Sequence, residues 1–279
     1  MTTLFDYHTH TALCKHAVGT MEQYVQAAVA GGLAEIGFSD HLPLPKAGPS
    51  PWNMAEDQLA GYIEAVLALR KQFAPFPVRL GVEADFFDDC VERTQALLAR
   101  HEWDYVIVSA HHLPPGAIGA QPPEPPREWT IDSPDELDEW RRQDVNAAWR
   151  AYFQTLTRMA GSGIGDIIGH CDLPKKFGHR PTCDMTAAYR ETASAFADAG
   201  VIVELNTAGL RRPAREIYPG LELLQIFRQA GVPITFGSDS HAPQEIAHAF
   251  DQAVALAKSA GYTHVQRCVG GRKFVASAL

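Results

Sequence analysis

Seven short apolar runs, separated by segments of helical character, constrain the fold of this 279-residue chain more than any other feature. The runs are rich in Val and Ile and mostly continuous in apolar character, as is typical of strands buried on both faces of a parallel sheet. We expect strands at residues 4–8, 35–40, 78–83, 105–111, 166–170, 201–206 and 233–239. Alternating strands and helices predict an α/β fold closed into a barrel. Because seven units are one fewer than the usual eight, we expect an irregular barrel, formed by a single domain over residues 1–279.

Helix-end signals and proline-rich loops mark the connections between these strands. "TMEQ" at Thr20 to Gln23 has the pattern of a capping box, and segments 219–231 and 243–261 are expected helices that end at glycine. Loops 42–55 and 112–132 are rich in proline, and each follows the C-terminal end of an expected strand. They could be ordinary stiff surface loops, but their position favours a wall or lid over a pocket.

Composition excludes several classes of protein. The formal net charge of -9 argues against a general nucleic-acid binder. No apolar run reaches the roughly 18 residues that a membrane span needs, and the N-terminal segment has no secretory pattern, so we expect a cytoplasmic protein. Five scattered cysteines without a CxxC pair favour reduced thiols over a disulfide framework.

Histidines and acidic residues gather at the C-terminal ends of the expected strands. Eight of the twelve histidines lie there, and a barrel brings these ends together at one mouth. A lone histidine at a strand end is usually only a polar residue meeting water, but scattered histidines have no reason to converge. Imidazole and carboxylate ligands without cysteine suit Zn²⁺, Fe or Mn²⁺. Nine candidates are too many for one ion, and they suit two or three ions that share a bridging carboxylate and act on phosphoesters.

The ordered motifs resemble those of one known family. "DYHTH", "SDH", "GVEAD", "SAHH", "GHCDLPKKFG", "ELNTAGLRRP" and "GSDSH" are together similar to the PHP (polymerase and histidinol phosphatase) family, and more narrowly to its monofunctional histidinol-phosphatases. The resemblance runs from residue 6 to about residue 245. It implies a distorted (β/α)7 barrel, in agreement with the seven strands expected above.

The resemblance also implies a centre of three divalent metal ions. The first ion would be held by His8, His10, Glu83 and Asp239; the second by Glu83, His111 and His170; and the third by His16, His41 and His241. Glu83 would bridge two ions, and Glu83, Asp239 and His241 would be the catalytic residues. Asp6 and Asp40 are expected either to orient ligand imidazoles or simply to cap the strand ends.

The implied reaction is hydrolysis of L-histidinol phosphate to L-histidinol and phosphate. Three divalent cations would change the formal charge from -9 to -3 and make the mouth locally cationic, which suits an anionic substrate. The resemblance places phosphate-binding cations in two loops, at Lys175 or Lys176 and at Arg211 or Arg212. Because the members of each pair are adjacent in sequence, we expect the side chain of one member to point away from the phosphate. Candidates for the histidinol moiety stay open: Asp85, Asp88, Trp52, Trp129 and Tyr218.

Three alternatives remain at this point. The chain could be a related phosphatase or phosphodiesterase that acts on nucleotides or phosphotyrosine, but the "KKFG" and "LRRP" segments favour the amino-alcohol phosphate. A metal-dependent amidohydrolase would need a bridging lysine at a strand end, and Lys175 lies too far beyond its strand. A degenerate, non-catalytic module would have lost ligands, and none is lost. The expected partner is a small phosphate ester, with no nucleic acid and no membrane; the sequence leaves the oligomeric state open.

Overall fold

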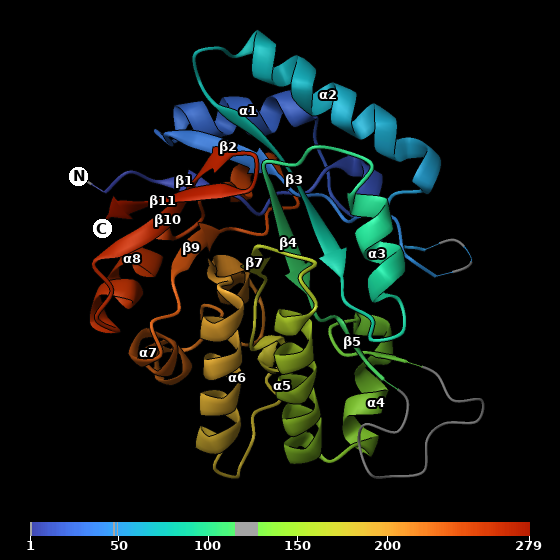
Figure 1. Cartoon of the computed structure of the whole chain (residues 1–279), viewed down its shortest axis with the longest axis vertical. Coiled ribbons are helices and arrows are strands. Elements are labelled where there is room, and N and C mark those ends of the chain that lie inside the picture. The colour runs from blue at the N-terminus through green and yellow to red at the C-terminus, as the bar shows by residue number, and fades with distance from the viewer. Residues whose placement is uncertain (1, 47, 49, 115–127) are drawn as a thin grey trace.

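A seven-stranded parallel sheet forms the centre of the computed structural model, which describes residues 2–46, 48, 50–114 and 128–279. The strand order is β1-β2-β3-β4-β7-β8-β9, so each strand pairs with the next strand of the barrel along the chain. Figure 1 shows β2, β3, β4 and β7 at the centre of the molecule. The strands are β1 (Phe5–Asp6), β2 (Glu35–Phe38), β3 (Val78–Asp85), β4 (Tyr105–Ser109), β7 (Ile167–Ile168), β8 (Ile202–Asn206) and β9 (Ile234–Gly237). The structure confirms the seven predicted strands, although most end earlier than expected.

The sheet curves into a nearly closed barrel. No continuous ladder joins β1 to β9 among the described residues, but the chain just beyond both strands is connected. The amide of His10 donates to the carbonyl of Ser240 (2.9 Å), and the amide of Ser240 donates to the carbonyl of His8 (3.1 Å). Closure therefore occurs at the C-terminal ends of the strands, where the predicted site residues lie.

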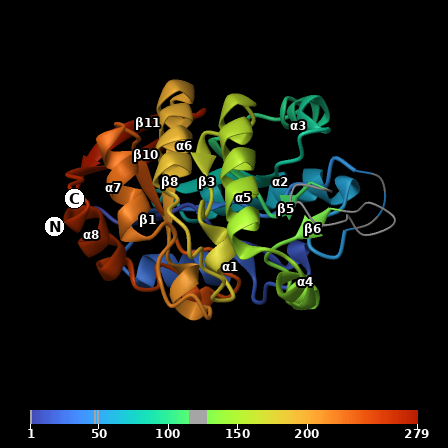
Figure 2. The same cartoon turned by 90° about the horizontal axis from the view of Figure 1, so that it is seen from below.

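Helices cover the outside of the barrel (Figure 2). They are α1 (Met21–Ala30), α2 (Leu59–Gln72), α3 (Val91–Leu98), α4 (Leu137–Arg142), α5 (Val145–Gly161), α6 (Thr186–Ala199), α7 (Leu221–Gln229) and α8 (Phe250–Ser259). The capping box predicted at Thr20 is present, because the Thr20 side chain accepts from the Gln23 amide and the Gln23 side chain accepts from the Thr20 amide.

The interior of the barrel is filled by Tyr105. Its hydroxyl donates to the carbonyl of Tyr7 (2.6 Å) and lies 3.1 Å from that of Phe38. Gly37 and Gly81 face the Tyr105 side chain so closely that a Cβ would lie 2.3 Å from its hydroxyl oxygen at Gly37 and 2.3 Å from its ring at Gly81. The two glycines therefore make room for a buried aromatic side chain, which shows that the barrel is a packed core and not a pore.

The predicted helix 243–261 begins later than expected. Pro243–Glu245 forms a single 3-10 turn, and α8 starts only at Phe250. Ala247 and Ala249 take positive φ values of 52° and 56°, and the Ala247 amide donates to the Asp6 carboxylate (3.0 Å). This side-chain acceptor competes with the helical hydrogen bond, so the chain turns once more before it becomes helical.

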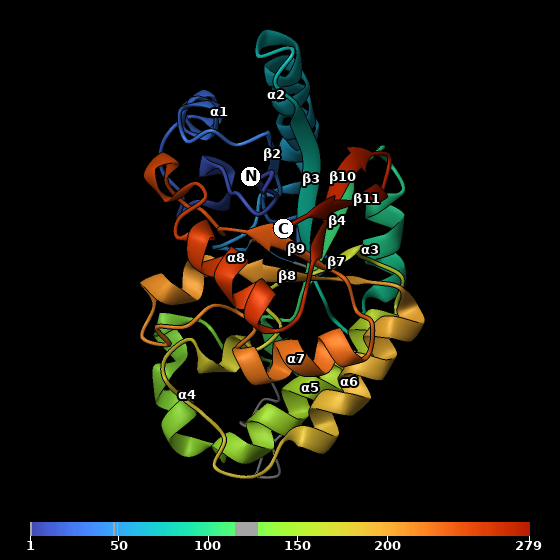
Figure 3. The same ribbon diagram turned by 90° about the vertical axis from the view of Figure 1, so that its left-hand side faces the viewer.

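Sequence reasoning missed the C-terminal hairpin of β10 (His264–Gly270) and β11 (Lys273–Ala278). It packs beside β9 and crosses the end of the barrel opposite the predicted site (Figure 3). Its contacts reach the N-terminal ends of the strands: Arg267 pairs with Glu35 and Arg272 with Asp166. Among the described residues, no helix is long and apolar enough to cross a membrane.

Candidate metal centre

Glu83, in β3 near its C-terminal end, is the centre of the site. The residue is 1% exposed, and five imidazoles surround its two carboxylate oxygens. Oε2 lies 3.1 Å from His41 Nδ1, 3.3 Å from His8 Nε2 and 3.6 Å from His10 Nε2. Oε1 lies 3.2 Å from His170 Nε2 and 3.6 Å from His111 Nε2. One carboxylate thus faces ligand atoms from the loops or ends of four other strands.

Asp239 forms a second acidic point beside Glu83. Its Oδ1 lies 3.2 Å from His10 Nε2, 3.5 Å from His241 Nδ1 and 3.9 Å from His8 Nε2. The residue has a φ of 52°, in the left-handed region that non-glycine residues rarely adopt. Arg211 Nη2 donates to the carbonyls of Ser238 (2.9 Å) and Asp239 (3.0 Å) and so holds this turn. Such strain, fixed by its surroundings, is typical of functional sites.

Three imidazoles are fixed from behind by other carboxylates. His8 Nδ1 lies 2.7 Å from Glu204 Oε1, and His111 Nδ1 lies 2.6 Å from Asp85 Oδ1. His10 Nδ1 lies 3.4 Å from Asp40 Oδ1. In each case the opposite ring nitrogen, Nε2, is left to face Glu83. A carboxylate that orients an imidazole and raises its basicity is a common feature of protein metal sites.

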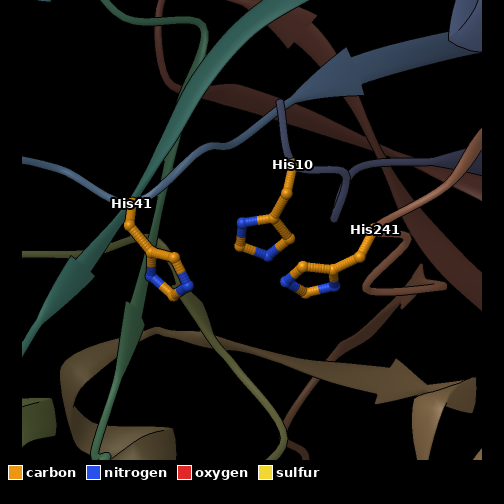
Figure 4. A group of neighbouring side chains, drawn as sticks. All are labelled: His10, His41 and His241. Carbon is orange, nitrogen blue, oxygen red and sulfur yellow. The ribbon is translucent and has the colours of Figure 1, made fainter. Parts of the chain in front are cut away.

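His16, His41 and His241 complete the set. The rings of His10 and His241 stack with centroids 4.1 Å apart, and the His16 ring lies 4.5 Å from that of His241. One ring nitrogen from each of His10, His41 and His241 lies within 4.8 Å of the other two, and Figure 4 shows these three side chains pointing toward one another. The Cys14 sulfur lies within the same distance of ligand nitrogens of His16 and His241.

The donor atoms fit divalent metal ions. Several of them are buried and have no hydrogen-bond partner in the part of the chain that the structure describes: His8 Nε2, His10 Nε2, His41 Nδ1, His241 Nε2 and Glu83 Oε2. Buried polar atoms are nearly always paired, because burial without a partner costs about 1–3 kcal/mol each. So many unpaired lone pairs in one place are what a metal cluster would satisfy, and the imidazole and carboxylate donors suit Zn²⁺, Fe or Mn²⁺.

Charge at the centre is set by these neighbours. Burial acts to raise the pKa of Glu83, but His8, His41 and His170 outweigh it and hold that pKa well below its usual value. The pKa of Asp239 is likewise held low against burial by His8, His10 and His241. Burial and the neighbouring imidazoles lower the pKa of His241, and burial lowers that of His41 to about 4. Carboxylates act the other way on three more imidazoles: Glu204 and Glu83 raise the pKa of His8 against burial, Asp239 and Asp40 raise that of His10, and Asp132 and Asp85 raise that of His111 to about 9. The site therefore combines ionised carboxylates with imidazoles whose protons divalent cations would replace.

A cavity of about 280 Å³ opens onto the centre. One wall carries Glu83, Asp239 and the histidines at positions 16, 41, 111, 170 and 241. The described parts of both proline-rich loops contribute, with Trp52 and Asn53 from the first and Thr130 and Asp132 from the second. The remainder of the second loop, residues 115–127, lies outside the described residues, so its predicted role as a lid stays a prediction.

In each of the two adjacent pairs, Lys175–Lys176 and Arg211–Arg212, one residue lines the cavity and the other does not. Lys176 and Arg212 line it. Lys175 is 1% exposed and is enclosed by Asp172 (2.7 Å), Glu216 (3.0 Å) and the carbonyl of Ile217 (2.8 Å). Arg211 holds the Asp239 turn as described above. The predicted phosphate role of Lys175 and Arg211 therefore has no geometric support, because their charged groups are used inside the fold.

Several other predicted residues serve different purposes. Asp6 accepts backbone amides of His8, Ser238 and Ala247, so it ties β1 to the loop after β9. This agrees with the second of its two expected roles, capping of the strand ends. Asp88 pairs with Arg158 and lies outside the cavity lining. Trp129 is buried against Trp140 and also lies outside the lining, whereas Trp52 and Tyr218 do line the cavity.

Glu204 was missed. It is 1% exposed, contacts His8 through Oε1, and accepts the His170 amide (3.0 Å) through Oε2. A sequence signal existed, because Glu204 interrupts the apolar strand "VIVELN" (201–206), where an acid is costly without a partner.

Residues 6–208 match the family model described as PHP domain, and the chain belongs to this family. It is 38% identical over 262 residues to a probable histidinol-phosphatase of Deinococcus radiodurans, covering 94% of this chain and 95% of that protein. It is 26% identical to the histidinol-phosphatase of Bacillus subtilis, over 88% of this chain and 96% of that protein.

A solved structure shares the fold. It is the histidinol phosphate phosphatase of Lactococcus lactis in complex with Zn, L-histidinol and phosphate, with a TM-score of 0.78 and 21% sequence identity. The match covers 98% of this chain and 99% of that chain. The predicted barrel and the predicted family are therefore confirmed.

Proposed function

We propose that this protein is a histidinol-phosphatase, a metal-dependent phosphomonoesterase that hydrolyses L-histidinol phosphate to L-histidinol and phosphate. The observation that carries the proposal is the set of buried, unpaired ligand atoms around Glu83, at one wall of a cavity that Lys176 and Arg212 also line. The names of the Deinococcus radiodurans and Bacillus subtilis relatives support this substrate. The ligands bound in the Lactococcus lactis structure also agree with it.

The residues that would hold three ions fall into overlapping groups. His8, His10, Glu83 and Asp239 would hold the first ion, and Glu83 with His111 and His170 the second. His16, His41 and His241 would hold the third, with His10 also near the last two. When bound, divalent cations neutralise charge on a phosphoryl group and lower the pKa of a water to about 7.

The chain's own residues prepare the site for an anion. Glu83 and Asp239 stay ionised because imidazoles hold their pKa values low, so they act as fixed charges that retain cations. Lys176 and Arg212 line the same cavity and would bind the phosphoryl oxygens, Arg212 in a bidentate manner and Lys176 as a point charge. Glu83, Asp239 and His241 line the same cavity and would be the catalytic residues, because they would hold the ions that act on the phosphoryl group.

We further propose that the chain acts as a single domain in the cytoplasm. One hydrophobic cluster extends from Phe5 to Cys268, which supports one folding unit.

Metal content and phosphate release, measured on the same preparation, test the function. The substrates are L-histidinol phosphate, a nucleoside monophosphate, phosphotyrosine and a generic aryl phosphate. We expect about three ions per chain, loss of activity after chelation, its return with Zn²⁺, Mn²⁺ or Fe²⁺, and a strong preference for L-histidinol phosphate. Equal rates with all four substrates would contradict the proposed substrate, and full activity of the chelated protein would contradict the metal mechanism.

A further inference from the structure

Among the described residues, four carboxylates line the cavity: Glu83, Asp85, Asp132 and Asp239. Three of these carboxylates already have partners within the protein. Glu83 and Asp239 face the imidazoles of the centre, as described above. Asp85 uses both oxygens, Oδ1 at 2.6 Å from His111 Nδ1 and Oδ2 as the acceptor for Asn53 Nδ2 (2.7 Å).

Asp132 differs from these three. Its side chain is 20% exposed, and its Oδ2 accepts from Lys176 Nζ (2.8 Å). The Asp132 carbonyl accepts from the same ammonium group (2.9 Å). The described part of the chain supplies no hydrogen-bond partner for Oδ1, and this atom is not among the buried unpaired ones, so it is left to the cavity.

We propose that Asp132 binds the ammonium group of the substrate and thereby selects phosphate esters of amino alcohols. The inference rests on the proposed function, because it assigns a contact to the organic part of that substrate. In L-histidinol phosphate the carbon that bears the ammonium group is separated from the ester oxygen by one methylene. Phosphate and ammonium are therefore neighbours in the substrate, as Lys176 and Asp132 are neighbours in the cavity.

The charge pattern supports this pairing. Lys176 neutralises part of Asp132, and the His111 and His170 imidazoles contribute further. When a phosphoryl group draws on Lys176, the Asp132 carboxylate gains from a cation of the substrate. The substrate ammonium supplies it, so that two positive and two negative groups alternate: Lys176, phosphate, ammonium and Asp132. A buried or half-buried carboxylate is stabilised only when such a partner is present.

A positioning role is the competing explanation, because Asp132 could act only by holding Lys176 in place. The positioning role and the ammonium-binding role predict different changes in substrate affinity. A positioning residue alters the affinity for every phosphate ester, whereas an ammonium-binding residue alters only substrates that carry the amine.

The test compares Asp132→Asn with the native protein on two substrates, L-histidinol phosphate and the corresponding imidazolylpropyl phosphate, which lacks the amine. We expect kcat/KM for L-histidinol phosphate to fall by about 10- to 100-fold through KM, and kcat/KM for the amine-free ester to change by less than about threefold. Calorimetric binding of L-histidinol and of inorganic phosphate gives a second readout: Asp132→Asn should weaken the first and leave the second nearly unchanged. Asp138→Asn is the matched control, because Asp138 is exposed, pairs only with Arg141 in the described structure, and lies outside the cavity lining.

Equal losses on both substrates would overturn the inference in favour of a positioning role, and unchanged binding of L-histidinol would overturn it outright. Failure of the proposed function is distinguishable, because it would appear in the native protein as absent hydrolysis of L-histidinol phosphate.

Discussion

The two ends of the barrel each contain a buried glutamate, and the two residues have opposite surroundings. At the N-terminal end of the strands Glu35 is fully buried, and its Oε2 pairs with Arg79 (2.9 Å) and Arg267 (3.0 Å). Its Oε1 accepts the hydroxyl of Tyr7. At the C-terminal end Glu83 faces five imidazoles, and three of the facing nitrogens, His8 Nε2, His10 Nε2 and His41 Nδ1, have no hydrogen-bond partner among the described residues.

The different surroundings indicate that Glu35 serves stability and Glu83 serves function. Glu35 has permanent cationic and hydroxyl partners within the protein, so its charge is compensated as soon as the chain folds. Among the described residues, the ion-pair partners of Glu83 are all histidines, whose ring nitrogens can exchange a proton for a metal ion. We therefore expect a bound cation to complete its surroundings. The first end is closed by the β10–β11 hairpin, and the second opens into the cavity.

The largest expected effect comes from exchanging the two glutamates for glutamine, one at a time. Glu83→Gln should lower kcat by about 1,000-fold or more and reduce the bound metal, because the negative charge that would hold the ions is lost. Glu35→Gln should instead lower the free energy of unfolding by about 1–3 kcal/mol, with metal content per folded chain unchanged. Metal analysis and thermal unfolding of both variants check this, and a Glu83→Gln protein that retains its metal and activity would refute the contrast.

His41→Ala should have the next largest effect. We expect the metal content to fall by about one ion per chain and activity to fall by about 100-fold, because His41 Nδ1 lies 3.1 Å from Glu83 and faces the proposed third position. Metal analysis alongside kcat measures both. His101→Ala, at a histidine outside the cavity lining, is the control, and full activity of His41→Ala would contradict the assignment of three ions.

The two adjacent arginines should give different kinetic defects. Arg212→Ala should raise KM for phosphate esters by about 10- to 100-fold with metal content unchanged, because its side chain lines the cavity. Arg211→Ala should reduce metal retention and kcat, because Arg211 holds the backbone of the Asp239 turn. Identical changes in KM and metal content for the two variants would show that the cavity does not distinguish them.

The smallest effect is expected for Arg267→Ala in the hairpin. Arg267 is one-third exposed, and Glu35 keeps Arg79 as a partner, so stability should fall by only about 1 kcal/mol. The KM and kcat for L-histidinol phosphate should stay within about twofold, because the change is at the opposite end of the barrel. Denaturant unfolding and steady-state kinetics measure the two quantities, and a large kinetic defect would show that the two ends are coupled.

Much of the fold could be predicted from the sequence, because strands buried on both faces of a parallel sheet appear as continuous apolar runs. Val- and Ile-rich runs predicted all seven strands, and histidines just beyond them predicted which ends would meet. The hairpin at 264–278 was missed because it is half exposed and its sequence "HVQRCVGGRKFVASA" mixes charge with apolar residues. Nothing local indicates that such a segment covers the open end of a barrel.

The sequence by itself determined the chemical types at the site, since imidazole and carboxylate groups follow strand ends whose convergence is dictated by the parallel barrel. Only the tertiary structure decided which member of each neighbouring pair is used. Lys175 and Lys176 are indistinguishable in the sequence, yet one is buried among Asp172 and Glu216 and the other lines the cavity beside Asp132. The physical reason is that spacing along a strand or turn fixes where a side chain begins, whereas its partner is supplied by chain segments that are distant in sequence.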